Sequence, residues 1–243
     1  NGNAIVEGGK FYRMDPGNPE WQKFWVDRVL AANTAWDGVF TDNLDLSLCA
    51  FERAGITVAK YGSDAAYTDA LQSFMKYIYE RITVGAGKPV SSNLVNGCSG
   101  RDNREKYFPY LSGGMDEAWA VDWSTGYVSA STWTADLASV DRFAGQLGRQ
   151  MILVSQGSST DTARQQFAFA SYLLVSGKNV VYRYSNAAQS DAYKVPWLFQ
   201  NYKAQLGAPQ GARYTQSDGS VRRDFANGYV VVNPSARTSS IVV

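Results

Sequence analysis

Hydrophobic positions along the chain alternate between short continuous runs and segments in which they recur every three or four residues. The short runs predict buried strands at residues 38–42, 89–94, 115–120, 151–155 and 180–184, after two extended segments at 4–6 and 11–14. The segments with helical spacing predict helices near residues 19–35, 64–82, 132–148, 160–177 and 191–206. Strands separated by helices indicate βαβ units and a parallel sheet.

The pattern changes at Gly207. Apolar residues then alternate with polar ones, and turn sequences stand at residues 217–220 and 227–228. This part predicts an antiparallel meander. We therefore expect a barrel-type domain at residues 1–206 and a small β-domain at residues 207–243.

Two architectures accommodate a parallel sheet: a (β/α)8 TIM-like barrel and an open doubly wound sheet. The glycine-rich residues 85–89 look like a phosphate loop, but they follow a helix, and Pro89 stands where Ser or Thr would hold magnesium. The barrel is therefore favoured. About six barrel strands are recognisable, so we expect the first one or two to lie upstream of Asn1. We therefore expect this sequence to be a processed form or a fragment of a longer chain.

Composition narrows the chemistry. The 243 residues are 45% hydrophobic and carry 23 basic and 22 acidic side chains, which suits a folded domain and favours neither nucleic acid nor membrane insertion as a partner. Histidine is absent. Its absence excludes Ser-His and Cys-His nucleophiles and most zinc or copper sites, so we expect no metal and no cofactor.

Polar side chains follow the predicted strands in succession. They are Asp15, Asp42, Asn43, Asn93, Asp116, Glu117, Gln156, Arg183 and Tyr184, with Asp45 in the loop after Asp42. In a barrel the carboxyl ends of the strands surround one mouth, where the active site lies. The sequence thus predicts a polar ring that binds substrate.

Asp42 and Glu117 are the expected catalytic pair. Glycosidic hydrolysis needs two carboxyl groups across the scissile bond and no metal. Trp119 and Trp123 follow Glu117 and would supply an apolar wall for the acid or a surface for a sugar ring. Asp116 competes with Glu117, because neighbouring residues of a strand point to opposite faces.

Residues 15–21 (DPGNPEW) and 36–43 (WDGVFTDN) resemble a group of secreted glycoside hydrolases. These are the hypothetical glycosyl-hydrolase families related to endo-α-1,4-polygalactosaminidases and, more distantly, to the α-galactosidase superfamily. The resemblance implies that Asp42 is the nucleophile and Glu117 the acid. Residues 224–235 are similar to the C-terminal β-domain of that group.

Cys49 and Cys98 follow two neighbouring predicted strands, which favours a disulfide and secretion over two unpaired thiols. The resulting hypothesis is a secreted or surface hydrolase that acts on a polysaccharide or oligosaccharide by retention. The alternative is a non-catalytic carbohydrate-binding or structural module that self-assembles in an extracellular filament, sheath or surface layer. A sugar isomerase or aldolase is disfavoured, since neither histidine ligands nor a strand-end Schiff-base lysine is present.

Overall fold

The computed structural model describes residues 4–7, 9–32, 34–44, 47–94, 101–122, 126–188 and 193–243. The chain forms two compact units, Asn1–Gly114 and Met115–Val243, and each is described by itself. The N-terminal unit contains β1 (Val6–Glu7), β2 (Phe11–Tyr12), α1 (Pro19–Ala32), β3 (Val39–Thr41), α2 (Cys49–Arg53), α3 (Asp64–Ile78), the π-helical turn η1 (Tyr79–Val84), β4 (Val90–Asn93) and the 3₁₀ turns η2 (Arg101–Lys106) and η3 (Phe108–Tyr110).

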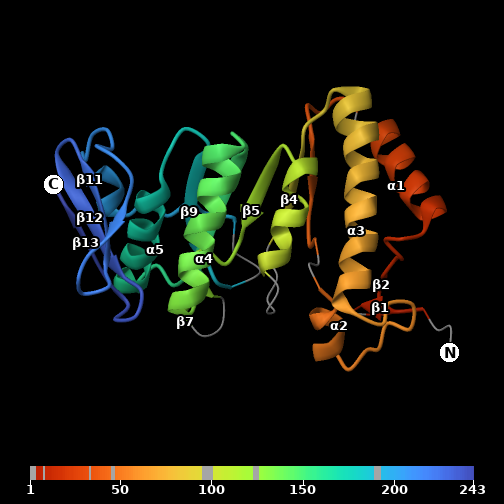
Figure 1. Ribbon diagram of the computed structural model, residues 1–243, viewed down its shortest axis with the longest axis horizontal. Helices are drawn as coiled ribbons and strands as arrows, with labels where there is room; N and C mark the ends of the chain where they lie inside the picture. The colour runs from red at the N-terminus through yellow and green to blue at the C-terminus, as the bar shows by residue number, and fades with distance from the viewer. Residues whose placement is uncertain are drawn as a thin grey trace. The chain divides into compact units, whose positions relative to one another are not determined.

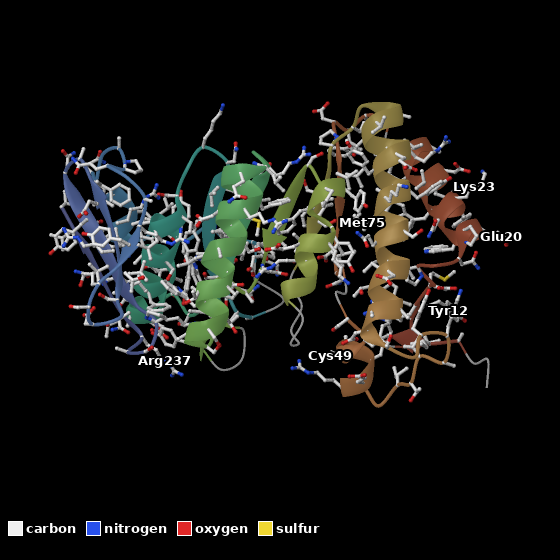
Figure 2. The ribbon with its side chains drawn as sticks, viewed as in Figure 1. Tyr12, Glu20, Lys23, Cys49, Met75 and Arg237 are labelled. Atoms are coloured by element: carbon white, nitrogen blue, oxygen red, sulfur yellow. The ribbon has the colours of Figure 1, made fainter. Side chains whose placement is uncertain are left out.

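Helix α3 forms the centre of the N-terminal unit. Ser63 caps it by accepting a hydrogen bond from the N–H of Ala66 at 3.2 Å. Its buried stripe recurs at helical spacing and comprises Tyr67, Leu71, Phe74, Met75 and Ile78. Helix α1 runs beside it, and the rings of Trp25 and Phe74 meet edge to face at 5.6 Å (Figure 1). Figure 2 shows Glu20 and Lys23 on the outer side of α1 and Met75 on the inner side of α3.

The C-terminal unit combines an α/β layer with an antiparallel sheet. Strand β5 (Gly113–Asp116) crosses the division between the units. After it come β6 (Val121–Asp122), β7 (Gly126–Tyr127), α4 (Ala130–Val140), the π-helical turn η4 (Asp141–Gln146), β8 (Gln150–Gly157), α5 (Thr162–Val175), β9 (Val180–Asn186), the 3₁₀ turn η5 (Gln200–Lys203), β10 (Tyr214–Thr215), β11 (Val221–Phe225), β12 (Gly228–Asn233) and β13 (Thr238–Val242).

Helix α5 joins the two layers of this unit. It packs against β8 and β9 on one side and against β11, β12 and β13 on the other, and Figure 1 shows it between them. Its sequence fits a helix covered on two sides, because apolar residues surround most of its circumference. Asp161 caps its start by accepting from the N–H of Arg164 at 3.1 Å.

The strands form an α/β sheet of the predicted class. Hydrogen bonds join five strands in the order β3-β4-β5-β8-β9, and the pairs β3–β4 and β8–β9 are parallel. A separate antiparallel sheet has the order β10-β11-β12-β13, which confirms the predicted C-terminal meander. Within the described residues β3 and β9 form the two edges of the five-stranded sheet, so closure into a barrel stays a prediction.

One predicted helix is wrong. In the described part of residues 191–206 the backbone forms only the short turn η5. Pro196 interrupts the apparent helical periodicity. The aromatic side chains that follow pack individually, and the rings of Trp197 and Phe199 lie 6.2 and 5.6 Å from that of Tyr184. The predicted strand at 115–120 also ends earlier, at Asp116. No helix in the described residues is long and apolar enough to cross a membrane.

Candidate active site

Parallel register brings Asp42 beside Asn93. Strands β3 and β4 pair Val39 with Val90 and Thr41 with Ser92. One step further along the strands, Asp42 therefore lies opposite Asn93, and their side chains point to the same face. Nδ2 of Asn93 donates to Oδ1 of Asp42 at 3.0 Å. Two strand ends predicted to face one mouth thus meet in the structure.

Neutral donors hold the Asp42 carboxylate. Besides Asn93, the backbone N–H of Asn43 donates to the same oxygen at 2.9 Å. Asn43 has a φ of 51°, a left-handed conformation that asparagine tolerates and that turns the chain sharply after the strand. Asn93 is buried, with 1% of its surface exposed, whereas Asp42 is exposed. The carboxylate of Asp42 is thus oriented by a buried donor and is open to solvent.

A pocket of about 290 Å³ adjoins Asp42. This volume lies at the lower end of the range for small-molecule sites. Its lining includes the aromatic residues Tyr12, Trp21, Trp25, Phe51, Tyr67 and Phe74, the apolar residues Met14, Pro16, Leu44, Leu71 and Ile78, and the polar or charged residues Arg13, Thr41, Asp42 and Asn43.

Asp15 occupies a different setting in the same unit. Its carboxylate pairs with the Lys60 ammonium and accepts hydrogen bonds from the Tyr61 hydroxyl and, at 3.0 Å, from the Gly17 N–H. Burial raises the pKa of Asp15, but these donors outweigh burial and leave the pKa below its usual value. Burial and the neighbouring carboxylate raise the pKa of Tyr61 to about 12. This geometry indicates that Asp15 holds its loop against residues 60–61 rather than binding a sugar.

In the C-terminal unit, Glu117 lies just beyond the end of β5. Its Oε1 accepts a hydrogen bond from Nε2 of Gln156 at 3.2 Å and another from the hydroxyl of Tyr193. Gln156 is buried and lies near the end of β8, opposite Ser185 of β9. The structure thus brings the predicted residues Glu117 and Gln156 together at the carboxyl ends of β5 and β8.

Arg183 also reaches this site through Tyr193. Its guanidinium carbon lies 5.3 Å from the centre of the Tyr193 ring, and its Nη2 donates to the Tyr193 carbonyl oxygen at 3.2 Å. Burial and the hydrogen bond to Glu117 raise the pKa of Tyr193. Sequence reasoning missed Tyr193, because it lies 76 residues from Glu117 in a segment predicted to be helical.

Five of the predicted substrate-binding residues are buried: Asn93 and Gln156, as described above, and also Trp119, Tyr184 and Asp116. Trp119 is 0% exposed, and its backbone is hydrogen-bonded to β8, so its ring offers no face to a sugar. Tyr184 is 1% exposed and packs among Trp197 and Phe199, and burial raises its pKa to about 12. Asp116 is 1% exposed, and its Oδ1 accepts from the N–H of Ala118 at 3.0 Å. The half-buried Glu117, rather than Asp116, is the accessible carboxyl of this pair.

Asp45, Trp123 and Cys98 lie outside the described residues. The predicted contribution of the first two to substrate binding, and the pairing of Cys98 with Cys49, therefore stay predictions. Within the described residues no cluster of three or more acidic or cysteine side chains has metal-binding geometry.

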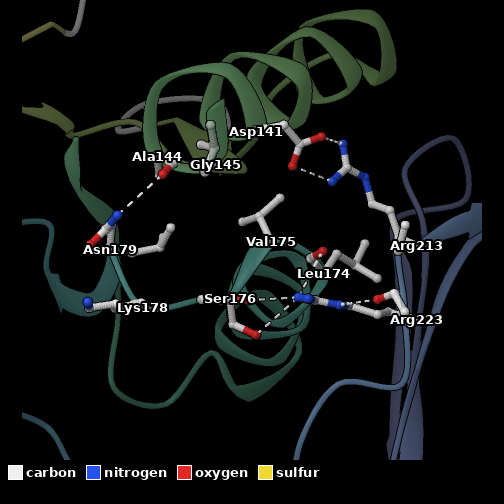
Figure 3. Close-up of a pocket in the computed structure, with 15 residues that line it drawn as sticks. Asp141, Ala144, Gly145, Leu174, Val175, Ser176, Lys178, Asn179, Arg213 and Arg223 are labelled. Carbon is white, nitrogen blue, oxygen red and sulfur yellow. Dashed lines mark hydrogen bonds and ion pairs between the residues drawn. The ribbon is translucent and has the colours of Figure 1, made fainter. Parts of the chain in front are cut away.

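A second cleft, of about 650 Å³, lies in the C-terminal unit at the amino-terminal end of β9 (Figure 3). Asp141, Arg213 and Arg223, which line it, bind other parts of the protein. Arg213 forms two hydrogen bonds with Asp141, at 2.9 and 2.7 Å. Nη1 of Arg223 donates to the carbonyl oxygens of Leu173, Leu174 and Ser176, which end α5. These contacts tie the antiparallel sheet to the helices and indicate a structural role.

Comparison with known proteins gives the family. The sequence model of hypothetical glycosyl hydrolase family 15 matches residues 1–229. Among solved structures, the glycoside hydrolase domain of PelA from Pseudomonas aeruginosa matches with a TM-score of 0.49 and 16% identity, over 75% of this chain and 66% of that domain. A single-residue variant of that domain matches with a TM-score of 0.48 at the same identity and coverage. No curated protein matches the chain.

Proposed function

Since the chain belongs to hypothetical glycosyl hydrolase family 15, we propose that it cleaves glycosidic bonds with Asp42 as nucleophile and Glu117 as acid and base. The observation that carries the proposal is the setting of Asp42: an exposed carboxylate at a strand end, oriented by the buried amide of Asn93 and beside a pocket lined in part by aromatic side chains. Such a group is positioned to attack an anomeric carbon.

In this mechanism Asp42 attacks the anomeric carbon while Glu117 protonates the departing glycosidic oxygen. A covalent glycosyl ester forms on Asp42, and the aglycone leaves as an alcohol. Glu117, now ionised, takes a proton from water, and the water oxygen displaces Asp42. The product keeps the anomeric configuration of the substrate.

We further propose a TIM-like barrel for residues 1–206, a β-domain for residues 207–243, and an extracellular polysaccharide or oligosaccharide as substrate. Asn43, Asp45, Trp123 and Arg183 are the remaining candidates for sugar binding. A Cys49–Cys98 disulfide would suit secretion. Thiol titration of the denatured, unreduced protein would give no free thiol if the disulfide forms and two if it does not.

Product stereochemistry tests the mechanism. The protein is incubated with a panel of polysaccharides and aryl glycosides, and the first-formed anomer is read by NMR. Retention supports the double displacement, and inversion contradicts it. Binding of a glycan without cleavage would instead support the non-catalytic alternative.

Azide rescue then assigns the two carboxyl groups. In Asp42→Ala, azide attacks the anomeric carbon directly and gives a glycosyl azide of inverted configuration. In Glu117→Ala, azide intercepts the covalent intermediate and gives a retained product. Asp37→Ala is the matched control, because Asp37 is an exposed carboxylate that precedes the same strand β3. If azide does not restore activity to one of these two variants, the role assigned to the residue replaced in that variant is rejected.

A further inference from the structure

The pocket beside Asp42 presents two aromatic side chains that the proposed mechanism does not use. Tyr12 of β2 and Trp21 of α1 line this pocket together with Asp42. We propose that Tyr12 and Trp21 bind the sugar unit that Asp42 attacks, by packing against the C–H face of a pyranose ring. The inference rests on the proposed role of Asp42 and extends that site to two further substrate-binding residues.

The two side chains have the chemistry that a sugar-binding surface needs. A pyranose ring has apolar C–H groups on its faces and hydroxyl groups around its edge. An aromatic side chain with a polar tip matches both, because it combines an apolar body with a hydrogen-bond donor. The Tyr12 hydroxyl and the Trp21 indole N–H form no hydrogen bond with another residue that the structure describes. Both donors are therefore available to sugar hydroxyls while the rings cover the C–H face.

Burial separates Tyr12 and Trp21 from other aromatic residues that line the same pocket. Phe51, Tyr67 and Phe74 are each at most 9% exposed and belong to the core. Tyr12 is 68% exposed, and Trp21 is half-buried. An aromatic ring exposed to this extent gains little from packing, so core formation does not explain why Tyr12 stands at the pocket.

Helix α1 holds Trp21 at the pocket without needing its ring. Oδ1 of Asn18 caps the helix by accepting from the N–H groups of Glu20 and Trp21 at 2.9 and 3.3 Å. Trp25 lies one turn later on the same side of the helix and packs edge to face against Phe74 of α3 at 5.6 Å. The cap and this ring contact fix α1, so a substitution of the Trp21 side chain leaves both in place.

The size of the pocket favours one sugar unit as its occupant. A volume of about 290 Å³ is small for a run of several sugar units. Because Asp42 lines the same small volume as Tyr12 and Trp21, a pyranose ring seated against the two aromatic rings has its anomeric carbon close to the carboxylate. The pocket thus joins a surface for the ring face to the proposed nucleophile.

The chain provides matched controls for both residues. Phe11 precedes Tyr12 on β2 and is 69% exposed, but it does not line the pocket. Trp36 is an exposed tryptophan that also lies outside the pocket lining. We expect Tyr12→Ala and Trp21→Ala each to raise KM roughly 5- to 10-fold with a smaller change in kcat, because ring stacking acts on bound substrate and transition state alike. Phe11→Ala and Trp36→Ala should change KM less than about twofold.

Fluorine NMR tests the contact without turnover. The Asp42→Asn variant is labelled with 5-fluorotryptophan at its seven tryptophans, and Trp21→Phe and Trp36→Phe identify the two signals of interest. Cellotriose, maltotriose and N-acetylchitotriose are titrated in turn. We expect at least one of them to shift the Trp21 signal and to leave the Trp36 signal in place. Adding Tyr12→Ala should weaken that binding roughly 5- to 10-fold, whereas Tyr12→Phe, which keeps the ring, should weaken it less than about twofold.

The outcomes separate this inference from the proposed function. A Trp21 signal that no trisaccharide shifts overturns the inference, and so does binding that Phe11→Ala weakens as much as Tyr12→Ala. A KM that stays unchanged in Tyr12→Ala and Trp21→Ala, or that rises only in step with a fall in Tm, also overturns it while the proposed function stands. A shift of the Trp21 signal without cleavage by the wild-type protein supports the inference and overturns the proposed function.

Discussion

Asp15 and Asp42 lie in the same unit, each beside a turn of the chain, yet their surroundings differ in one decisive respect. The carboxylate of Asp15 pairs with the Lys60 ammonium, whereas that of Asp42 accepts from a neutral amide and a neutral backbone N–H. A carboxylate paired with a cation is neutralised, and the ion pair stabilises the fold. Neutral donors orient a carboxylate and leave its charge available to a cationic transition state.

The largest expected effect comes from removing the charge of Asp42. Asp42→Asn keeps an acceptor for Asn93 but loses the proposed nucleophile, so kcat/KM should fall roughly 10³-fold or more, with little change in stability. Initial rates on a substrate from the glycan panel and a urea unfolding curve measure both quantities. Asp15→Asn is the paired control and should keep its activity within about threefold. The reverse pattern would break the comparison.

Arg223 extends the comparison to a charge used for stability in the C-terminal unit. It donates to three carbonyl oxygens at the end of α5, which would otherwise lose hydrogen-bond partners. Arg223→Ala should lower the free energy of unfolding by about 2–3 kcal/mol, since these are hydrogen bonds from a charged group. Urea denaturation measures the loss. Arg223→Lys, which keeps the charge but not the planar fork, should recover only part of it.

Asp15 should make stability depend on pH in the acid range. Its folded-state pKa is lowered, so its contribution is present above the unfolded-state pKa and is lost as pH falls through the folded-state value. The side chains of Asp15 and Lys60 are 30% and 58% exposed, which limits the contribution to about 1 kcal/mol. Unfolding curves of wild type and Asp15→Asn should differ at pH 7 and converge near pH 2. A constant difference across this range would argue against the ion pair.

Asp141 should show the smallest effect. Its bidentate pair with Arg213 is largely exposed on the carboxylate side, at 49%. Asp141→Asn should cost less than about 1 kcal/mol and should leave activity unchanged. A double-mutant cycle with Arg213→Ala at low and high salt measures the coupling, which salt should weaken. An activity loss here would show that the contrast drawn from Asp15 and Asp42 does not extend to this cleft.

The prediction that polar residues at the ends of neighbouring strands lie close together is confirmed for Asp42 and Asn93, because the register of paired strands is regular. Asp42 and Asn93 follow paired strands, so a correct prediction of the strands sufficed to place them together. The same logic placed Gln156 beside Glu117. Tyr184, expected at a strand end, and Trp119, expected as an aromatic wall, are both buried, because residue type does not tell which face of a chain segment becomes covered.

The amino-acid sequence by itself determined the order and type of most elements, the antiparallel sheet at the end of the chain, and the family of hydrolases. Hydrophobic periodicity, caps such as Ser63 and turn residues act over a few positions, so these features are legible locally. Tertiary structure alone decided that the segment around Trp197 packs without a helix, that Asp15 is paired with Lys60, and that Tyr193 reaches Glu117. Each of these depends on contacts between residues dozens of positions apart, and burial and charge pairing across such distances are set only when the chain is packed.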